Sequence, residues 1–180
     1  ATKVGNQILA HWEEWGGALN NPIRICHGDP KISNIRFAPD RFDHGCMIDL
    51  DTIGPSSLAV EMGDAWRSWC NPAGEDEPQN VSFDLDAFTS SAEGWLEGWS
   101  SAGAKLNAEE LQSLVPGIER ICLELAARFC ADSVNNSYFK EDQARFPQPG
   151  KHNLIRALSQ LTLAQEARRQ AARCHQILGS

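Results

Sequence analysis

The sequence has little of what marks several large classes of protein. It contains no apolar run near the roughly 20 residues that a bilayer-spanning helix requires, and no basic segment followed by an apolar one near its first residue. Its six cysteines form no C-x-x-C pair, and it has fewer basic residues than acidic ones, 16 against 24. We therefore expect a cytoplasmic protein with reduced thiols, which binds neither nucleic acid nor a membrane.

The length suits one folded domain. At roughly 150 residues per domain, 180 residues make one domain, and a hydrophobic share of 42% supplies a real core. A domain of this size needs neither disulfides nor a metal ion to stay folded. The net charge of −8 is common in soluble proteins and says little about the substrate.

Apolar side chains recur every three to four residues over most of the chain, which predicts amphipathic helices. One helix is expected within residues 4–19, with its end at Gly16-Gly17. Asp84 and Asn107 are expected to cap two later helices, and Pro116 to bend or split one of them. The later helices are expected over 58–70, 85–102, 108–133 and 152–178, with long loops over 71–82 and 133–151.

A small β-rich region is predicted between the first helix and residue 58. Strands are expected over 23–26, 35–37 and 46–50, with a turn-rich segment over 38–45. Strands in one short region and helices elsewhere predict an α+β, mostly helical fold. In this fold a strand cluster carries loops, and a helical body lies behind it.

The most informative stretch is HGDPKISN, residues 27–34, which is followed by IDLD at 48–51. A strand that ends in His-x-Asp places Asp29 on a tight loop, and Asn34 can return to the same small volume. Asp49, at the end of a neighbouring expected strand, could then share a divalent cation with Asn34. Mg²⁺ takes few hard oxygen ligands from a protein and leaves positions for substrate phosphates. Phosphoryl transfer requires this geometry.

These motifs resemble those of a known enzyme family. Protein kinases use H-R-D-x-x-x-x-N and D-F-G, whereas here Gly28 replaces the Arg and IDLD replaces the second motif. The pattern resembles the aminoglycoside phosphotransferase family, which shares the protein-kinase-like fold and includes choline, homoserine and sugar kinases. The segments IDLDTIGPSSLAVEMGDAWRSWC, RFCADSVNNSYFK and KHNLIRALSQLTL are similar to its N-acetylhexosamine 1-kinase branch. The resemblance covers most of the chain.

The resemblance implies an enzyme that uses Mg²⁺ and ATP to phosphorylate a hydroxyl of a small molecule, such as a sugar, an amino sugar or an aminoglycoside. Asp29 would accept or orient the proton of the attacking hydroxyl, and Asn34 and Asp49 would hold Mg²⁺ against the triphosphate. Lys31 would neutralise charge that develops on the transferred phosphoryl group. His27 is expected to anchor the loop by hydrogen bonding, not to act as an acid or base.

Two carboxylates near these motifs have two interpretations each. Asp51 is either a further metal ligand or a carboxylate behind the metal ligands, since a spacing of two puts it on the same strand face as Asp49. Asp64 either favours the dipole of its helix or, as the family implies, braces the catalytic loop through backbone amides. Glu61 stands where relatives often carry an Asp.

Side chains on the helices also have competing interpretations. Arg128 lies on or beside the apolar stripe of its helix, where it either pairs with Glu124 or, as the resemblance to sugar kinases implies, faces the acceptor together with Tyr138. Trp66 and Trp69, three residues apart, are expected to pack in the core and not to form a ligand cage.

Several parts of such an enzyme cannot be placed in the sequence. These are a loop that covers ATP, a strand Lys that binds the α- and β-phosphates, and a helix Glu that orients this Lys. The 26 residues before His27 contain one lysine, Lys3, and no G-x-G-x-x-G. We therefore expect residues 1–180 to form the C-terminal lobe, with an N-terminal lobe as partner, and to be inactive alone.

Two other functions are alternatives. A metal-dependent hydrolase would use His27, Asp29, His44, Asp49 and Asp51 around one or two cations. A non-catalytic kinase-like binding module would instead recruit a partner through its helical surface.

Overall fold

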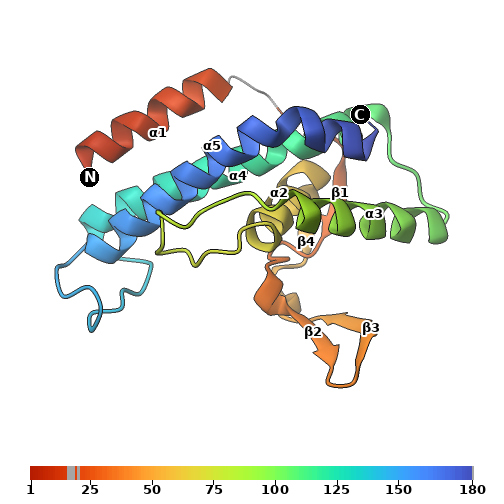
Figure 1. Ribbon diagram of the computed structural model, residues 1–180, viewed down its shortest axis with the longest axis horizontal. Helices are drawn as coiled ribbons and strands as arrows, with labels where there is room; N and C mark the ends of the chain where they lie inside the picture. Colours follow the sequence, from red (N-terminus) through yellow and green to blue (C-terminus); the bar gives the residue numbers. More distant parts are fainter. Residues whose placement is uncertain (16–18, 20, 180) are drawn as a thin grey trace.

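The computed structural model describes residues 1–15, 19 and 21–179, without the side chains of residues 42–44. Helices make up most of this part: α1 (Thr2–Trp15), α2 (Leu58–Trp69), α3 (Leu85–Ser101), α4 (Ala108–Asn135) and α5 (Lys151–Leu178). Helices α4 and α5 lie side by side in opposite directions and are joined by the loop 136–150 (Figure 1). Helices α1 and α2 both pack on α4, so α4 is the central helix of the body.

Two small antiparallel sheets lie between α1 and α2 in the sequence. One pairs β1 (Ile23–Cys26) with β4 (Gly54–Ser57), and the other pairs β2 (Ile35–Ala38) with β3 (Arg41–Met47). Short 3₁₀ turns, η1 (Ile32–Asn34) and η2 (Leu50–Thr52), stand beside them. The β2–β3 hairpin projects away from the helical body (Figure 1). The expected α+β, mostly helical architecture is confirmed.

The helices agree with the sequence pattern more closely than the strands do. Asp84 and Asn107 cap α3 and α4 as expected, and Asn107 forms a full capping box with Glu110. Pro116 was expected to bend or split its helix, but α4 runs through it unsplit. The expected helix end at Gly16-Gly17 lies outside the described residues.

The prediction of a strand over 46–50 is wrong. Strand β3 ends at Met47 and begins at Arg41, within the segment expected to be turn. Asp49 has a left-handed backbone with φ of 68°, which no strand residue adopts. Strand β4 was not expected because it contains Gly54 and Pro55, which a two-stranded sheet tolerates because both its strands are edges.

Helices α2 and α4 approach each other closely through two glycines. A Cβ atom on Gly63 would lie 2.5 Å from the carbonyl oxygen of Gly117, and a Cβ on Gly117 would lie 2.2 Å from that of Ala59. Only glycine permits this approach, because any side chain would collide with backbone. The contact fixes α2, which carries the residues that brace the candidate site.

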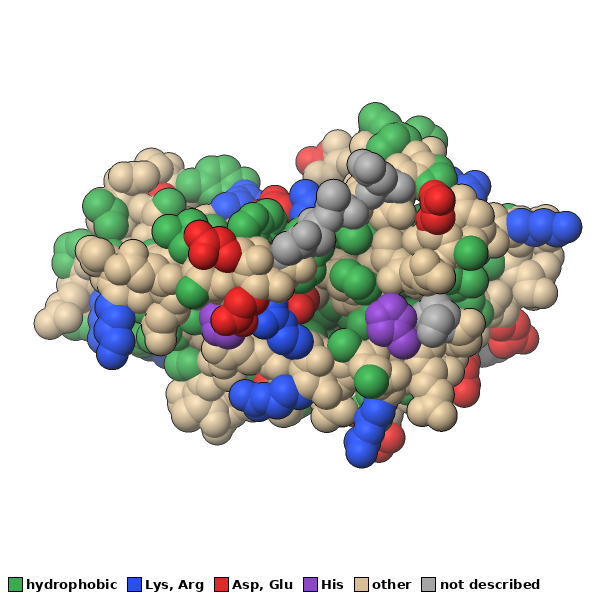
Figure 2. Space-filling view, turned by 90° about the horizontal axis from the view of Figure 1, so that it is seen from above, with side chains coloured by type: hydrophobic (Ala, Val, Ile, Leu, Met, Phe, Trp, Pro, Cys, Tyr) green, Lys and Arg blue, Asp and Glu red, His purple; other side chains and the backbone are tan. Residues whose placement is uncertain are grey.

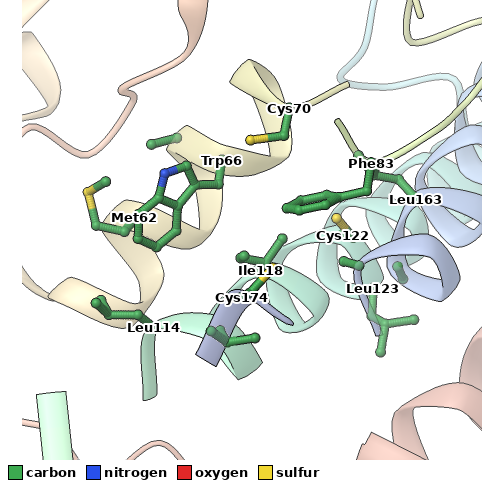
Figure 3. Close-up of a cluster of buried hydrophobic side chains, with 14 of the residues drawn as sticks. Met62, Trp66, Cys70, Phe83, Leu114, Ile118, Cys122, Leu123, Leu163 and Cys174 are labelled. Atoms are coloured by element: carbon green, nitrogen blue, oxygen red, sulfur yellow. The ribbon is translucent and has the colours of Figure 1, made fainter. Parts of the chain in front are cut away.

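The core lies where α2, α4 and α5 meet (Figure 3). Trp66 is fully buried there, and Cys70, Cys122 and Cys174 lie in the same cluster. All six cysteines are free thiols. Burial raises the pKa of Cys122 and of Cys174 to about 12, so these thiols stay neutral and serve as apolar core side chains.

The surface carries both signs of charge. On the face shown in Figure 2, acidic, basic and apolar side chains are interspersed. None of the described helices combines the length and the apolar character needed to cross a bilayer.

Candidate active site

The loop that follows β1 carries the HGDPKISN motif, and Glu61 of α2 holds its first turn. The two carboxylate oxygens of Glu61 accept the backbone N–H groups of His27 and Gly28, each at 2.9 Å. One side chain thereby fixes two successive peptide groups at the strand end. Hydrogen bonds to a carboxylate are stronger than those between neutral groups.

His27 joins this loop to the IDLD segment. Its Nε2 lies 2.8 Å from the carbonyl oxygen of Ile48, and its Nδ1 accepts the backbone N–H of Asp29 at 3.3 Å. Thr52 donates its hydroxyl to the carbonyl oxygen of His27 at 2.8 Å. With both ring nitrogens engaged, His27 serves as a structural hydrogen-bonding residue in this arrangement.

Gly28 is required where the loop turns. It has a φ of +85°, and a Cβ atom there would lie 2.5 Å from the backbone oxygen of Thr52. An L-residue would be strained in this conformation and would also collide with that oxygen. The loop conformation therefore requires glycine at position 28.

Helix α2 braces the middle of the loop through its last turn. Trp69 donates its indole N–H to the carbonyl oxygen of Pro30 at 2.8 Å, and Ser68 accepts the N–H of Ile32 at 3.0 Å. Trp66 packs in the core as expected, but Trp69 is only partly buried and also contacts the loop. Together with Glu61, these contacts hold the motif at both ends.

Four of the expected site residues lie together beside this loop. The Asn34 side-chain nitrogen lies 3.1 Å from Oδ2 of Asp29 and 3.4 Å from Oδ2 of Asp49. Lys31 donates from its ammonium group to the same Oδ2 of Asp29. This contact, strengthened by Asp49 and Asp64 nearby, raises the pKa of Lys31, which therefore remains a cation.

The Asp29 carboxylate keeps one side available. Lys31 and Asn34 both contact Oδ2, and Asn34 also donates to the backbone oxygen of Asp29 at 2.9 Å. No described residue donates a hydrogen bond to Oδ1. A carboxylate fixed through one oxygen can accept a proton from a bound hydroxyl through the other.

Asn34 and Asp49 carry the kinds of oxygen that can bind a magnesium ion, an amide oxygen and a carboxylate. Asn34 is buried and Asp49 is exposed, and the Asn34 atom that contacts Asp49 is the amide nitrogen, so a metal ion would take the amide oxygen instead. The left-handed backbone of Asp49 is unusual for a residue other than glycine, and such strain concentrates at functional sites. These two residues are the pair that would hold the metal.

Two carboxylates take positions that differ from the expectations. Asp51 lies exposed in η2, and within the described part of the chain no hydrogen bond or ion pair joins it to another residue. It does not share a strand face with Asp49, because that segment is not a strand. Asp64 fits neither of its two interpretations. It lies past the first turn of α2, where Glu61 is the acidic residue, and it pairs with Arg67 at 2.8 Å, while Glu61 provides the brace.

A cavity of about 680 Å³ opens beside Asp29 and Lys31. Arg128 and Tyr138 line it as well, so the structure places them in one cavity with Asp29. Arg128 is exposed and its guanidinium carbon lies 5.4 Å from the ring centre of Tyr138. The alternative partner, Glu124, instead lies 3.8 Å from Arg120.

A buried carboxylate shapes the wall that carries Tyr138. Asp132, at the end of α4, accepts the backbone N–H groups of Ser137, Tyr138 and Phe139 at 2.9–3.0 Å. The side chain of Asn153 on α5 donates to it at 3.1 Å. These hydrogen bonds lower the pKa of Asp132, with the one from Ser137 contributing most.

Sequence reasoning missed the residues that act through the tertiary fold. Nothing in the sequence indicated that Glu61 and Trp69 brace the loop, except that Glu61 stands where relatives often carry an Asp. The bracing depends on how α2 packs against the loop. Lys140 and Arg156 also line the cavity, and only the return of α5 along α4 brings them there.

The hydrolase alternative receives no support from the geometry. Among residues whose side chains the structure describes, no group of three or more His, Cys, Asp and Glu could hold a metal ion. The side chain of His44, a member of that expected site, lies outside the described part.

A comparison with protein families gives one match that bears on these observations. A family model described as APH, phosphotransferase enzyme family, matches residues 2–101, which is more than half of the chain. The matched segment contains the HGDPKISN loop, Asp49 and all of α2.

Proposed function

Because the chain belongs to the phosphotransferase enzyme family, we propose that it transfers the γ-phosphoryl group of ATP, with Mg²⁺, to a hydroxyl of a small molecule. The acceptor classes are those that the sequence resemblance implies, a sugar, an amino sugar or an aminoglycoside. In this proposal the chain has a protein-kinase-like fold and forms the lobe that carries the catalytic residues and binds the acceptor.

The observation that carries the proposal is the meeting of three side chains at Asn34. Its amide group contacts the carboxylates of Asp29 and Asp49 at 3.1 and 3.4 Å, which joins the HGDPKISN loop to the IDLD segment. The residue proposed to accept the proton and the two proposed to hold the metal therefore lie close together. Phosphoryl transfer depends mainly on such positioning and on electrostatic stabilisation.

Each residue has a distinct task in this proposal. Asp29 orients the acceptor hydroxyl and takes its proton through the free Oδ1. Lys31, kept protonated by its carboxylate neighbours, offsets charge on the transferred group. Asn34 and Asp49 hold Mg²⁺, which when bound neutralises the phosphate oxygens of ATP.

We also propose that a partner lobe covers ATP. Large apolar side chains are exposed around the strands: Ile23 and Ile25 on β1, and Phe37 on β2, are 67%, 76% and 49% exposed. Large exposed apolar groups are often covered by another folded unit. The N-terminal lobe expected from the sequence is the occupant we assign to this surface.

The test of the function is ADP release from Mg·ATP by the whole protein with a panel of sugars, amino sugars and aminoglycosides. We expect release that requires one class of hydroxylated acceptor, with a phosphorylated product. The chain of 180 residues alone should give no turnover. Rapid ADP release from that chain alone would contradict the role given to the partner lobe.

The metal assignment has its own test. Asp49→Asn removes the charged ligand but keeps a side chain that tolerates the left-handed backbone. We expect the Mg²⁺ concentration for half-maximal activity to rise at least about tenfold, since ligand charge sets affinity for hard cations. Asp51→Asn is the matched control, and an equal effect of both changes would refute the assignment to Asp49.

A further inference from the structure

The cavity beside Asp29 is more basic than the chain as a whole. Five cationic side chains and four carboxylates line it, in a protein with a net charge of −8. At the end near the catalytic loop the charges are paired, because Lys31 contacts Asp29, and Arg67 contacts Asp64 at 2.8 Å. The remaining three cations of the lining are Arg128, Lys140 and Arg156.

The part of the lining that Arg128, Lys140 and Arg156 form is here called the basic wall. Within the part of the chain that the structure describes, no carboxylate pairs with Arg128 or Lys140. Arg156 forms a long ion pair with Glu75 at 4.0 Å, and its Nε is buried without a hydrogen-bond partner. Two carboxylates of the lining lie outside the catalytic loop and α2: Glu75, which also pairs with Arg67 at 3.7 Å, and Glu124, which pairs with Arg120 at 3.8 Å. The three cations of the basic wall are therefore only partly compensated.

Aromatic rings support the two guanidinium groups of the basic wall. The guanidinium carbon of Arg128 lies 5.4 Å from the ring centres of Tyr138 and Phe139, and that of Arg156 lies 5.4 Å from the ring centre of Phe129. An arginine held over a ring keeps in-plane N–H donors for a planar or tetrahedral anion.

The basic wall is also held in place by hydrogen bonds. Asp132 fixes the loop that carries Tyr138 and Phe139, and Arg156 donates to the backbone oxygen of Lys140 at 3.0 Å. A preorganised set of donors binds an anion with a smaller loss of conformational entropy than mobile surface lysines do.

We propose that the basic wall binds an anionic group, a carboxylate or a phosphate, on the acceptor molecule. The inference rests on the proposed function, because it names the class of acceptor whose hydroxyl would meet Asp29. It favours anionic sugars or other hydroxylated acids over polycationic acceptors such as aminoglycosides. A polycation would be repelled by Arg128, Lys140 and Arg156, whose charge Glu75 and Glu124 offset only in part.

The test is equilibrium binding by titration calorimetry, without ATP, of four probes that share one hexose ring. These are D-glucuronate, D-glucose 6-phosphate, D-glucose and D-glucosamine. We expect one or both anionic probes to bind at least about tenfold more tightly than glucose, with glucosamine weakest. The anion preference should decrease as salt is raised, because screening weakens exposed charge pairs. The stronger of the two anions identifies the group that the wall accepts.

Two variants locate the effect. Arg128→Gln should remove most of the anion preference, measured as the ratio of the anion affinity to the glucose affinity. Arg173→Gln, an equal change of charge at an exposed position of α5 outside the cavity, should leave all four affinities unchanged. Tightest binding of glucosamine, failure of both anions to bind, or an anion preference that survives in Arg128→Gln would overturn the proposal.

Failure of this inference and failure of the proposed function give different results. Anion-selective binding without any acceptor-dependent ADP release would support the basic wall and count against the phosphotransferase function. Acceptor-dependent ADP release with a cationic amino sugar as the best substrate would support the function and overturn the anionic acceptor.

Discussion

Replacing Glu61 by Ala tests whether α2 holds the catalytic loop. The change removes two hydrogen bonds to a carboxylate, from the N–H groups of His27 and Gly28, each at 2.9 Å. Such bonds are worth about 1.5–3 kcal/mol each. Because Gly28 is exposed and His27 partly so, water replaces part of this loss. We therefore expect the lower end, about 3 kcal/mol for the pair.

The effect on activity should exceed the effect on substrate binding. Without Glu61 the loop can shift relative to Asp49, and a misplacement of about 1 Å can cost about 100-fold in rate. We expect kcat to fall about 100-fold with little change in the KM for ATP. Glu61→Gln, which keeps one acceptor oxygen, should lie between Glu61→Ala and the wild type.

Urea unfolding of the chain and the ADP assay on the whole protein measure these two effects. Glu97→Ala, an exposed glutamate of α3, is the matched control and should change stability by less than about 0.5 kcal/mol. If Glu61→Ala unfolds at the same urea concentration as this control and keeps its kcat, the bracing role is wrong.

Three further predictions follow from single contacts. Gly63→Ala should destabilise the chain by about 1–3 kcal/mol in urea unfolding, because its Cβ would meet the backbone of α4. The control Gly94→Ala, which has open space around it, should instead stabilise the chain by about 0.5–1 kcal/mol. The hydrogen bonds that lower the pKa of Asp132 stabilise the fold above the usual aspartate pKa near 3.9, and this stabilisation is lost as the pH falls below it. In the same assay, the difference in unfolding free energy between wild type and Asp132→Asn should be constant from pH 7 to about pH 5 and shrink by pH 3. Lys31→Met should lower kcat at least about tenfold and leave the melting temperature within a few degrees, because Lys31 is partly exposed; a normal kcat would exclude its proposed role.

The sequence predicted the parts of the fold that depend on local pattern. Apolar spacing and the capping residues Asp84 and Asn107 placed the helices to within about two residues, because amphipathic helices carry their burial pattern in the sequence. Strand β4 escaped prediction because its four residues contain Gly and Pro and pair only with β1, 28 or more positions earlier. The end of β3 was misplaced because Ile48 continues its apolar pattern, although the backbone turns at Asp49.

The candidate site divides in the same way. Asp29, Asn34 and Asp49 were found from spacing, since a tight loop between short strands limits where these side chains can lie. The sequence could not show that Glu61, and not Asp64, contacts the loop. The two residues are three positions apart on α2, and only the packing of that helix decides which of them faces the loop. The basic wall was missed for a similar reason: Lys140 and Arg156 reach the cavity only after the loop 136–150 folds back on α4.

The central claim is that Asp29 receives the proton of the acceptor hydroxyl in a phosphoryl transfer assisted by Asn34 and Asp49. The most direct measurement is kcat of Asp29→Ala in the whole protein with Mg·ATP and the best acceptor from the panel. Base and orientation effects are worth about 100-fold or more, so we predict a rate below about one hundredth of wild type with the fold intact. A rate above about one tenth of wild type would contradict the account.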